Sequence, residues 1–267
     1  MIKCDFHTHT ILCDGENTAC EMAEAAYKKG LSAFGFSGHG YTPFDDSYCM
    51  SQEDTNQYLT QIQKLKSEYA GKLEIFAGLE ADLFSEYDRC RFDYIIGSVH
   101  YIKIGNNYID VDNTSQILKY AADKYFGGDM LSLCEEYYKQ IATLQNIDIV
   151  GHFDLVTKFC QQEDLFDMTC SRYRMSALSA LDILIDKNLI FEVNTGAISR
   201  RARTTPYPEP FILKRILERG GQVILSGDAH NTAGICAHFD IAEQLLKSLG
   251  FKNVVTITKN GFSEVKL

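Results

Sequence analysis

The chain has 267 residues, of which 36 are acidic and 26 are basic, so its formal net charge is −10. Hydrophobic residues make up 45%, which is ordinary for a globular protein with a sizeable core. The acidic balance argues against a broad contact with nucleic acid or an anionic membrane, because both need a basic surface. An anionic substrate would need positive charge that is placed locally.

Nine cysteines lie singly along the chain, in an odd number and without a Cys-x-x-Cys pair. This usage indicates reduced thiols in a cytoplasmic protein. The chain reaches Lys3 and Asp5 without an apolar leader, and no uncharged apolar run approaches the roughly 18 residues of a membrane span. We therefore expect neither targeting nor anchoring, while the oligomeric state stays open.

Short apolar runs alternate with helical patterns along the chain. The first run, residues 2–6, is followed by a helix from Thr18, where Glu21 completes a capping box and Gly30 ends the pattern. The later runs are 33–36, 73–79, 94–99, 148–150, 189–193, 223–225 and, more weakly, 254–257. The later helical patterns are 51–69, 129–144, 171–186, 210–219 and 239–249. No linker or repeat interrupts them, which favours one α/β domain spanning 1–267 with a parallel sheet.

Polar residues follow each of the first seven runs. They are His7 and His9, then His39, Glu80, His100, His152, Asn194, and finally Asp228 and His230. In a closed barrel all strand ends open on one face, whereas a doubly wound sheet gathers ligands mainly at one switch point. The use of every strand end therefore favours a barrel.

Nitrogen and carboxylate ligands suit zinc, iron or manganese. Period-two spacing lets His7 and His9 reach one ion, and Asp228 and His230 repeat that arrangement. A single histidine at a strand end is more often structural, so the joint pattern carries the prediction. Glu80 adds weight, because a lone carboxylate is costly to bury. Asp14 is as easily a turn residue as a ligand, and His238, at the start of a predicted helix, is treated as a non-ligand.

With these motifs assembled, the chain resembles the polymerase and histidinol phosphatase (PHP) family, and within it the histidinol-phosphate phosphatase branch. The resemblance covers nearly the whole length. It implies a distorted seven-stranded (β/α) TIM-like barrel around three divalent metal ions. One ion would lie on His7, His9, Glu80 and Asp228, a second on Glu80, His100 and His152, and a third on Asp14, His39 and His230. Glu80 would bridge the first two ions.

The branch is indicated by the segment 151–159 and by the segment that ends in Pro206-Tyr207-Pro208. The resemblance implies that Lys158 and Arg200 bind the phosphate. Arg201 and Arg203 are alternatives to Arg200, and for any one of these arginines a place in a solvated loop is the simpler interpretation. Asn194 is a further candidate for substrate binding. The implied catalytic set is Glu80, Asp228, Lys158 and Arg200.

The implied reaction is hydrolysis of L-histidinol phosphate to L-histidinol and phosphate, a step of histidine biosynthesis. Two neighbouring ions would lower the pKa of a bridging water and present hydroxide to the phosphorus atom. The proton donor to the leaving alcohol is open. The alternatives are a PHP nucleotide phosphatase, tyrosine phosphatase or exonuclease, and a non-catalytic metal-binding PHP module. An amidohydrolase barrel fits Glu80 and the Asp228–His230 pair less well.

Overall fold

One curled sheet forms the centre of the computed structural model, which describes residues 2–267. Within this range the sheet has nine strands in the order β1-β2-β3-β4-β7-β8-β9-β10-β11. The strands are β1 (Cys4–Asp5), β2 (Ala33–Phe36), β3 (Glu74–Asp82), β4 (Tyr94–Ser98), β7 (Ile149–Val150), β8 (Ile190–Asn194), β9 (Gln222–Ser226), β10 (Asn253–Thr258) and β11 (Gly261–Lys266). All neighbours pair in parallel except β10 and β11, which form an antiparallel hairpin.

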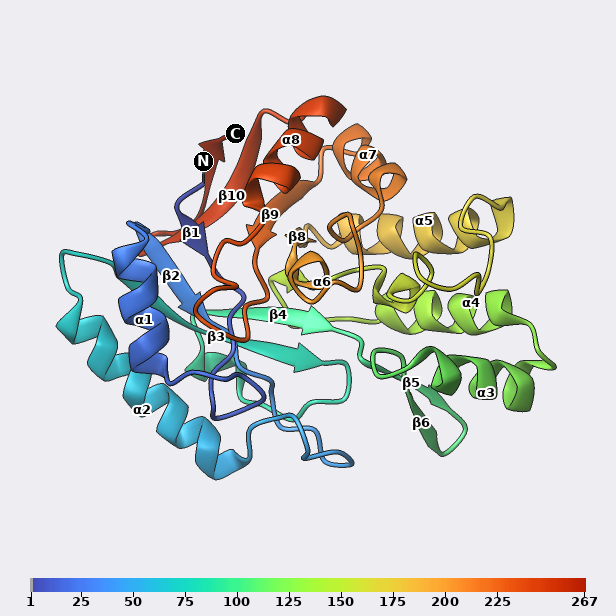
Figure 1. Cartoon of the computed structure of the whole chain (residues 1–267), viewed down its shortest axis with the longest axis horizontal. Helices are drawn as coiled ribbons and strands as arrows, with labels where there is room; N and C mark the ends of the chain where they lie inside the picture. The colour runs from blue at the N-terminus through green and yellow to red at the C-terminus, as the bar shows by residue number, and fades with distance from the viewer. Residues whose placement is uncertain (1) are drawn as a thin grey trace.

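Helices cover the outside of the sheet, as parallel strands require for their crossovers. They are α1 (Ala19–Lys28), α2 (Gln52–Glu68), α3 (Ser115–Phe126), α4 (Met130–Ile141), α5 (Ser171–Asp186), α6 (Gly196–Ser199), α7 (Pro210–Glu218) and α8 (Phe239–Leu249), with two 3₁₀ turns at Arg89–Arg91 and Leu155–Thr157. The capping box predicted at Thr18 and Glu21 is present at the start of α1. In Figure 1, α1 and α2 flank one side of the sheet and α3, α4 and α5 the other.

The sheet closes into a distorted barrel at the end of β1. Thr8, just beyond β1, forms a parallel bridge with Ala229, just beyond β9. The amide of Ala229 donates to the carbonyl of His7 at 3.0 Å, and the amide of His9 donates to the carbonyl of Ala229 at 2.9 Å. Figure 1 shows these two loops side by side in the middle of the molecule. The segments that carry the first and last predicted ligands are thereby joined.

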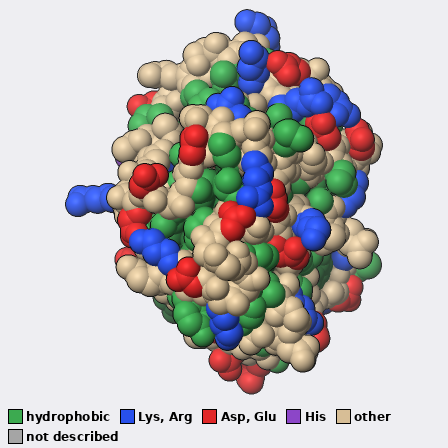
Figure 2. Space-filling view, turned by 90° about the vertical axis from the view of Figure 1, so that its right-hand side faces the viewer, with side chains coloured by type: hydrophobic (Ala, Val, Ile, Leu, Met, Phe, Trp, Pro, Cys, Tyr) green, Lys and Arg blue, Asp and Glu red, His purple; other side chains and the backbone are tan. Residues whose placement is uncertain are grey.

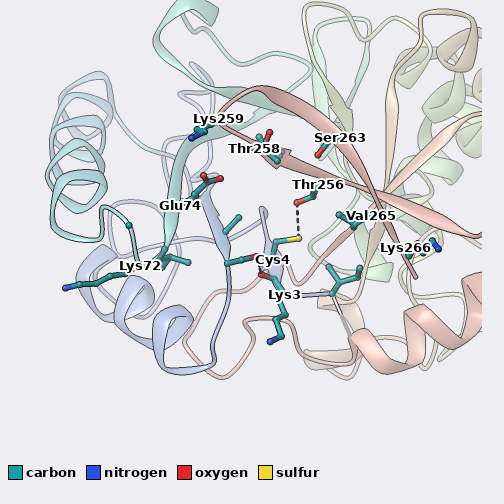
Figure 3. A pocket seen from close by; sticks show the side chains of 16 residues that line it. Lys3, Cys4, Lys72, Glu74, Thr256, Thr258, Lys259, Ser263, Val265 and Lys266 are labelled. Atoms are coloured by element: carbon teal, nitrogen blue, oxygen red, sulfur yellow. Dashed lines mark hydrogen bonds between the residues drawn. The ribbon is translucent and has the colours of Figure 1, made fainter.

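At the other end of the barrel, a side-chain contact joins β10 to β1. The hydroxyl of Thr256 in β10 donates to the sulfur of Cys4 in β1 at 3.3 Å. Figure 3 shows this contact in a groove that Lys3, Lys72 and Lys266 also line. The groove is formed by the starts of β1, β2 and β3 together with β10 and β11. It therefore lies away from the strand ends where the predicted ligands gather.

Tyr94 of β4 connects the barrel interior to the segments that carry the first predicted ligands. Its buried hydroxyl lies within hydrogen-bond distance of two carbonyl oxygens, that of Phe6 at 2.5 Å and that of Phe36 at 2.9 Å, to which its single hydrogen can be donated. A Cβ atom on Gly78 would lie 2.2 Å from the Tyr94 ring, and one on Gly35 would lie 2.3 Å from its hydroxyl. Glycine is required at both positions because the ring crosses there. The tyrosine thus fixes the backbone immediately before His7.

The predicted parallel α/β barrel is confirmed, and all eight predicted strands are present. Besides the two 3₁₀ turns, five of the described elements were not predicted: the strands β5 (Tyr101–Ile104) and β6 (Asn107–Asp110), which form a hairpin, the helices α3 and α6, and β11. Strand β11 is mostly exposed, so it lacks the apolar run that marks a buried strand. Helix α6 has four residues, too few for a helical period.

Basic and acidic side chains intermingle on the face shown in Figure 2. Ion pairs also join separate segments of the chain, such as Arg172 of α5 with Asp129 before α4 and Lys119 of α3 with Glu163. All nine cysteines are free. Among residues 2–267, no helix has the length and apolar character of a membrane span.

Candidate metal centre

The predicted ligands occupy strand ends on one face of the barrel, as the sequence predicted. His7 and His9 follow β1, His39 follows β2, Glu80 lies near the end of β3, and His100 and His152 follow β4 and β7. Asp228 and His230 follow β9, and Asp14 lies in the loop after β1. Three groups of these side chains could each hold an ion: His9, Asp14, His39 and His230; His7, His9 and Glu80; and His39, Glu80 and His100.

One oxygen of Glu80 faces the first two histidines of the chain and His39. Glu80 Oε2 lies 3.1 Å from His7 Nε2 and 3.5 Å from His9 Nε2. His39 Nδ1 lies 3.0 Å from the same oxygen. Asp228 approaches from the loop after β9, with its Oδ1 3.3 Å from His9 Nε2 and 3.7 Å from His7 Nε2. These atoms form a compact group of nitrogen and oxygen donors.

The second oxygen of Glu80 faces different histidines. Glu80 Oε1 lies 2.9 Å from His152 Nε2 and 3.4 Å from His100 Nε2. The hydroxyl of Ser98 donates to this oxygen at 2.7 Å and restricts the rotation of the carboxylate. Because each oxygen meets its own set of imidazoles, the geometry is that of a carboxylate able to bridge two ions.

Asp14 belongs to a third group. Its Oδ2 lies 3.1 Å from His230 Nε2 and 3.6 Å from His39 Nε2, and its Oδ1 lies 3.5 Å from His9 Nδ1. The side chain is one-third exposed, so this group lies nearer to solvent than Glu80 does. The structure therefore places Asp14 among the candidate ligands and not merely in a turn.

The donors fit divalent metal ions. His7 Nε2, His9 Nε2 and Glu80 Oε2 are buried and have no hydrogen-bond partner within residues 2–267. Three such atoms converging in one place are costly unless a cation satisfies them. The set is imidazole nitrogen and carboxylate oxygen, which suits zinc, iron or manganese.

Electrostatics keep two of the donors, His9 and Glu80, in forms that can bind a metal. Burial and the neighbouring imidazoles of His230 and His39 lower the pKa of His9 to about 3, so its ring is neutral and able to bind a metal. Burial alone would raise the pKa of Glu80, but His7, His39 and other imidazoles hold that pKa well below its usual range. Glu80 is therefore an ionised carboxylate despite being 1% exposed.

Glu192 is a functional candidate that the sequence interpretation missed. Its Oε1 lies 2.5 Å from His7 Nδ1, so the carboxylate holds the ring with Nε2 aimed at Glu80. Its Oε2 accepts the amide of His152 at 2.9 Å. Such outer carboxylates orient metal-binding histidines. The signal was available, because Glu192 is a charged residue inside an apolar strand.

Asp5 supports the centre through the backbone. Its fully buried carboxylate accepts amides of His7 at 3.3 Å, Gly227 at 2.9 Å and Cys236 at 2.8 Å. Burial raises the pKa of Asp5 to about 6, although these amides oppose the shift. The carboxylate links β1 to the loop after β9 and so fixes both ligand-bearing segments.

The three candidate arginines lie in different surroundings. The guanidinium of Arg200 donates to Asp228 Oδ2 at 2.8 Å and to the Asp228 carbonyl at 3.1 Å. The buried Arg203 instead binds Thr157 and Glu209, away from the candidate ligands. Arg201 is exposed. Of the three, Arg200 is the one that the structure brings to the metal centre.

Lys158 and Asn194 both have partners within the protein. Lys158 Nζ donates to Asp112 Oδ1 at 2.5 Å and to the Asp112 carbonyl at 2.7 Å. The amide of Asn194 donates to Glu192 at 2.9 Å and to Asp228 at 3.3 Å. Asn194 therefore holds two carboxylates of the centre, and its predicted contact with substrate stays a prediction. His238 is exposed at the start of α8 and belongs to none of the three ligand groups.

Comparison with known proteins places this geometry in a family. The model of the PHP domain matches residues 5–196. The chain belongs to the PHP family. A PHP relative from Deinococcus radiodurans, described as a probable histidinol-phosphatase, is 30% identical, with 94% of this chain and 95% of the relative covered. The histidinol-phosphatase of Bacillus subtilis is 27% identical, with 88% and 96% covered.

The PHP fold is also seen in a solved structure of histidinol phosphate phosphatase from Lactococcus lactis, complexed with zinc, L-histidinol and phosphate. That structure superposes with a TM-score of 0.74 at 22% identity and covers 98% of both chains. This likeness confirms the predicted fold over nearly the whole length.

Proposed function

We propose that this PHP protein hydrolyses L-histidinol phosphate to L-histidinol and phosphate. The observation that carries the proposal is the convergence of six histidines and three carboxylates, with Glu80 as one of the three, on a chain whose relatives along nearly the full length are described as histidinol-phosphatases. A complete set of ligands favours an enzyme over a non-catalytic metal-binding module. Together with Arg200 and Lys158, the proposed divalent ions would give the site the positive charge that a phosphate monoester needs.

Three divalent ions, of zinc, iron or manganese, are the cofactors we propose. The first would be held by His7, His9, Glu80 and Asp228, the second by Glu80, His100 and His152, and the third by Asp14, His39 and His230. The groups of donor atoms support the first and third positions, the distances of His100 and His152 from one oxygen of Glu80 support the second, and the zinc in the Lactococcus lactis complex supports that metal. When bound, such ions supply Lewis acidity and positive charge for phosphate hydrolysis.

The side chains around the centre perform separate tasks in this proposal. Glu192 and Asn194 keep His7 and Asp228 in place, so the ligands need little reorganisation. Arg200 presents its guanidinium at Asp228 and is suited to a phosphate oxygen. Lys158 supplies a second cation once a phosphate competes with Asp112 for its ammonium group.

A PHP enzyme of different substrate range is the second candidate. Nucleotide or tyrosine phosphatases would use the same metal ligands and the same two cations. An exonuclease needs a basic track for the nucleic-acid backbone, and the net charge of −10 disfavours it. The choice among phosphate monoesters therefore depends on contacts with the leaving group.

Phosphate release from four substrates separates these candidates. The purified protein is assayed with histidinol phosphate, p-nitrophenyl phosphate, phosphotyrosine and a mononucleotide, and its metal content is measured by elemental analysis. We expect kcat/KM to be highest for histidinol phosphate and to vanish on chelation. Equal, slow rates on all four substrates would reject the histidinol assignment.

A further inference from the structure

The hydroxyl of Tyr207 is buried beside the candidate site and has no hydrogen-bond partner. Tyr207 is 1% exposed, and its hydroxyl oxygen has no partner among the described residues. Buried tyrosines normally satisfy the hydroxyl. Three other buried tyrosines of this chain do so: Tyr58, Tyr94 and Tyr137 donate to backbone carbonyls. The exception therefore points to a partner from outside the protein.

The position of Tyr207 is fixed on two sides. Its amide donates to the carbonyl of Asn194 at 2.9 Å, and its carbonyl accepts the amide of Asn194 at 2.9 Å. The guanidinium of Arg203 lies 4.5 Å from the ring centroid. Asn194 is the last residue of β8, so the tyrosine is anchored to a strand end of the barrel. A ring held in this way keeps its hydroxyl in one place.

The surroundings of the hydroxyl are those expected of a phosphate site. The Tyr207 ring centroid lies 6.3 Å from that of His152, a candidate metal ligand. Burial raises the pKa of the Tyr207 hydroxyl well above its usual range, and the charges of Arg203, Asp112, Asp154 and Arg200 also act on it. Asp112 pairs with Lys158 and not with Tyr207. The hydroxyl thus lies within the electrostatic influence of Arg200, one of the two cations proposed to hold phosphate, and of Asp112, the partner of the other, without using that carboxylate as its acceptor.

We propose that Tyr207 is a further substrate-binding residue, whose hydroxyl donates a hydrogen bond to a non-bridging oxygen of the phosphate group. The inference rests on the proposed phosphatase activity. Burial keeps the phenol protonated, as a donor must be. The contact stabilises the phosphate in both the bound substrate and the transition state, so it acts on any phosphate monoester that the site accepts.

The test uses Tyr207→Phe, which removes the oxygen and retains the ring and its contact with Arg203. Tyr137→Phe is the matched control, because that buried hydroxyl already has a partner within the protein, the carbonyl of Phe153 at 3.2 Å. Each variant is assayed with histidinol phosphate and with p-nitrophenyl phosphate, and inhibition by inorganic phosphate is measured with the second substrate. Metal content and thermal stability are recorded for both.

For Tyr207→Phe we expect wild-type metal content, unreduced thermal stability, and a loss of about tenfold or more in kcat/KM on both substrates. Inhibition by inorganic phosphate should weaken by a similar factor, and Tyr137→Phe should leave both quantities unchanged. Unchanged phosphate inhibition, or a loss seen only with histidinol phosphate, overturns the proposal. An equal loss in Tyr137→Phe does the same.

A second measurement does not depend on any variant. A crystal of the wild-type, metal-loaded protein soaked with inorganic phosphate should have a phosphate oxygen within hydrogen-bond distance of the Tyr207 hydroxyl, and a phosphate bound elsewhere contradicts the assignment. If histidinol phosphate is not hydrolysed but p-nitrophenyl phosphate is, the proposed substrate fails. Tyr207 is then still judged by phosphate inhibition and by the crystal.

Discussion

Replacing Glu80 by glutamine tests the bridging geometry while keeping the volume of the side chain. In the wild-type protein one oxygen faces His7 at 3.1 Å and the other faces His152 at 2.9 Å. Glutamine offers a single carbonyl oxygen, and its NH₂ group cannot bind a metal. One of the two proposed ion positions therefore loses its shared ligand, whichever way the amide is turned.

Replacing a residue that only orients a metal ligand typically lowers metal affinity or activity by about 10- to 100-fold, and we expect a larger loss here because Glu80 itself would contact the ions. We expect Glu80→Gln to bind fewer ions and to lose about 100-fold or more in kcat, and Glu80→Ala to lose more. Elemental analysis and phosphate release measure both quantities. Glu74→Gln is the control, because Glu74 lies exposed at the other end of the same strand. Wild-type metal content and turnover in Glu80→Gln would refute the bridging role.

Three other changes test the surroundings of the centre. Glu192→Gln should weaken metal binding by about 10- to 100-fold in a chelator competition, because His7 loses its orienting carboxylate; unchanged affinity would contradict that role. Arg200→Ala should raise KM for the phosphorylated substrate more than it lowers metal content, and Arg201→Ala, at an exposed residue, is the control. An unchanged KM in Arg200→Ala would show that Arg200 does not bind the phosphate. Asp5→Ala leaves three buried amides without their acceptor, so urea unfolding should reveal a loss of about 3 kcal/mol or more, and a loss below about 1 kcal/mol would refute the linking role.

The strand-end pattern made much of the fold and the site predictable. Parallel strands are buried on both faces, so they appear as short apolar runs, and the polar residue after each run marks the open end of the barrel. That reasoning reached His39, His100 and His152, each of which has little meaning alone. It also reached Glu80, since an isolated carboxylate in an apolar strand needs a cation.

The supporting residues could not be predicted in the same way. Glu192 was not among the predicted site residues: its charge inside an apolar strand is visible in the sequence, but its role depends on a contact with His7, which is 185 positions away. Arg200, Arg201 and Arg203 are equivalent in sequence, and only the turn after α6 separates them into a site residue, an exposed residue and a buried one. The Tyr207 hydroxyl stands out only because it is buried and has no hydrogen-bond partner among the described residues, and neither property can be read from the sequence.

The central claim is that these strand-end side chains form one metal centre organised by Glu80. It is tested most directly by anomalous X-ray scattering from a crystal of the protein loaded with zinc. The account predicts ions beside His7 and His9, beside His100 and His152, and within the group of Asp14 and His230, with the two oxygens of Glu80 contacting different ions. Zinc bound elsewhere, or a Glu80 carboxylate that contacts no ion, would contradict it.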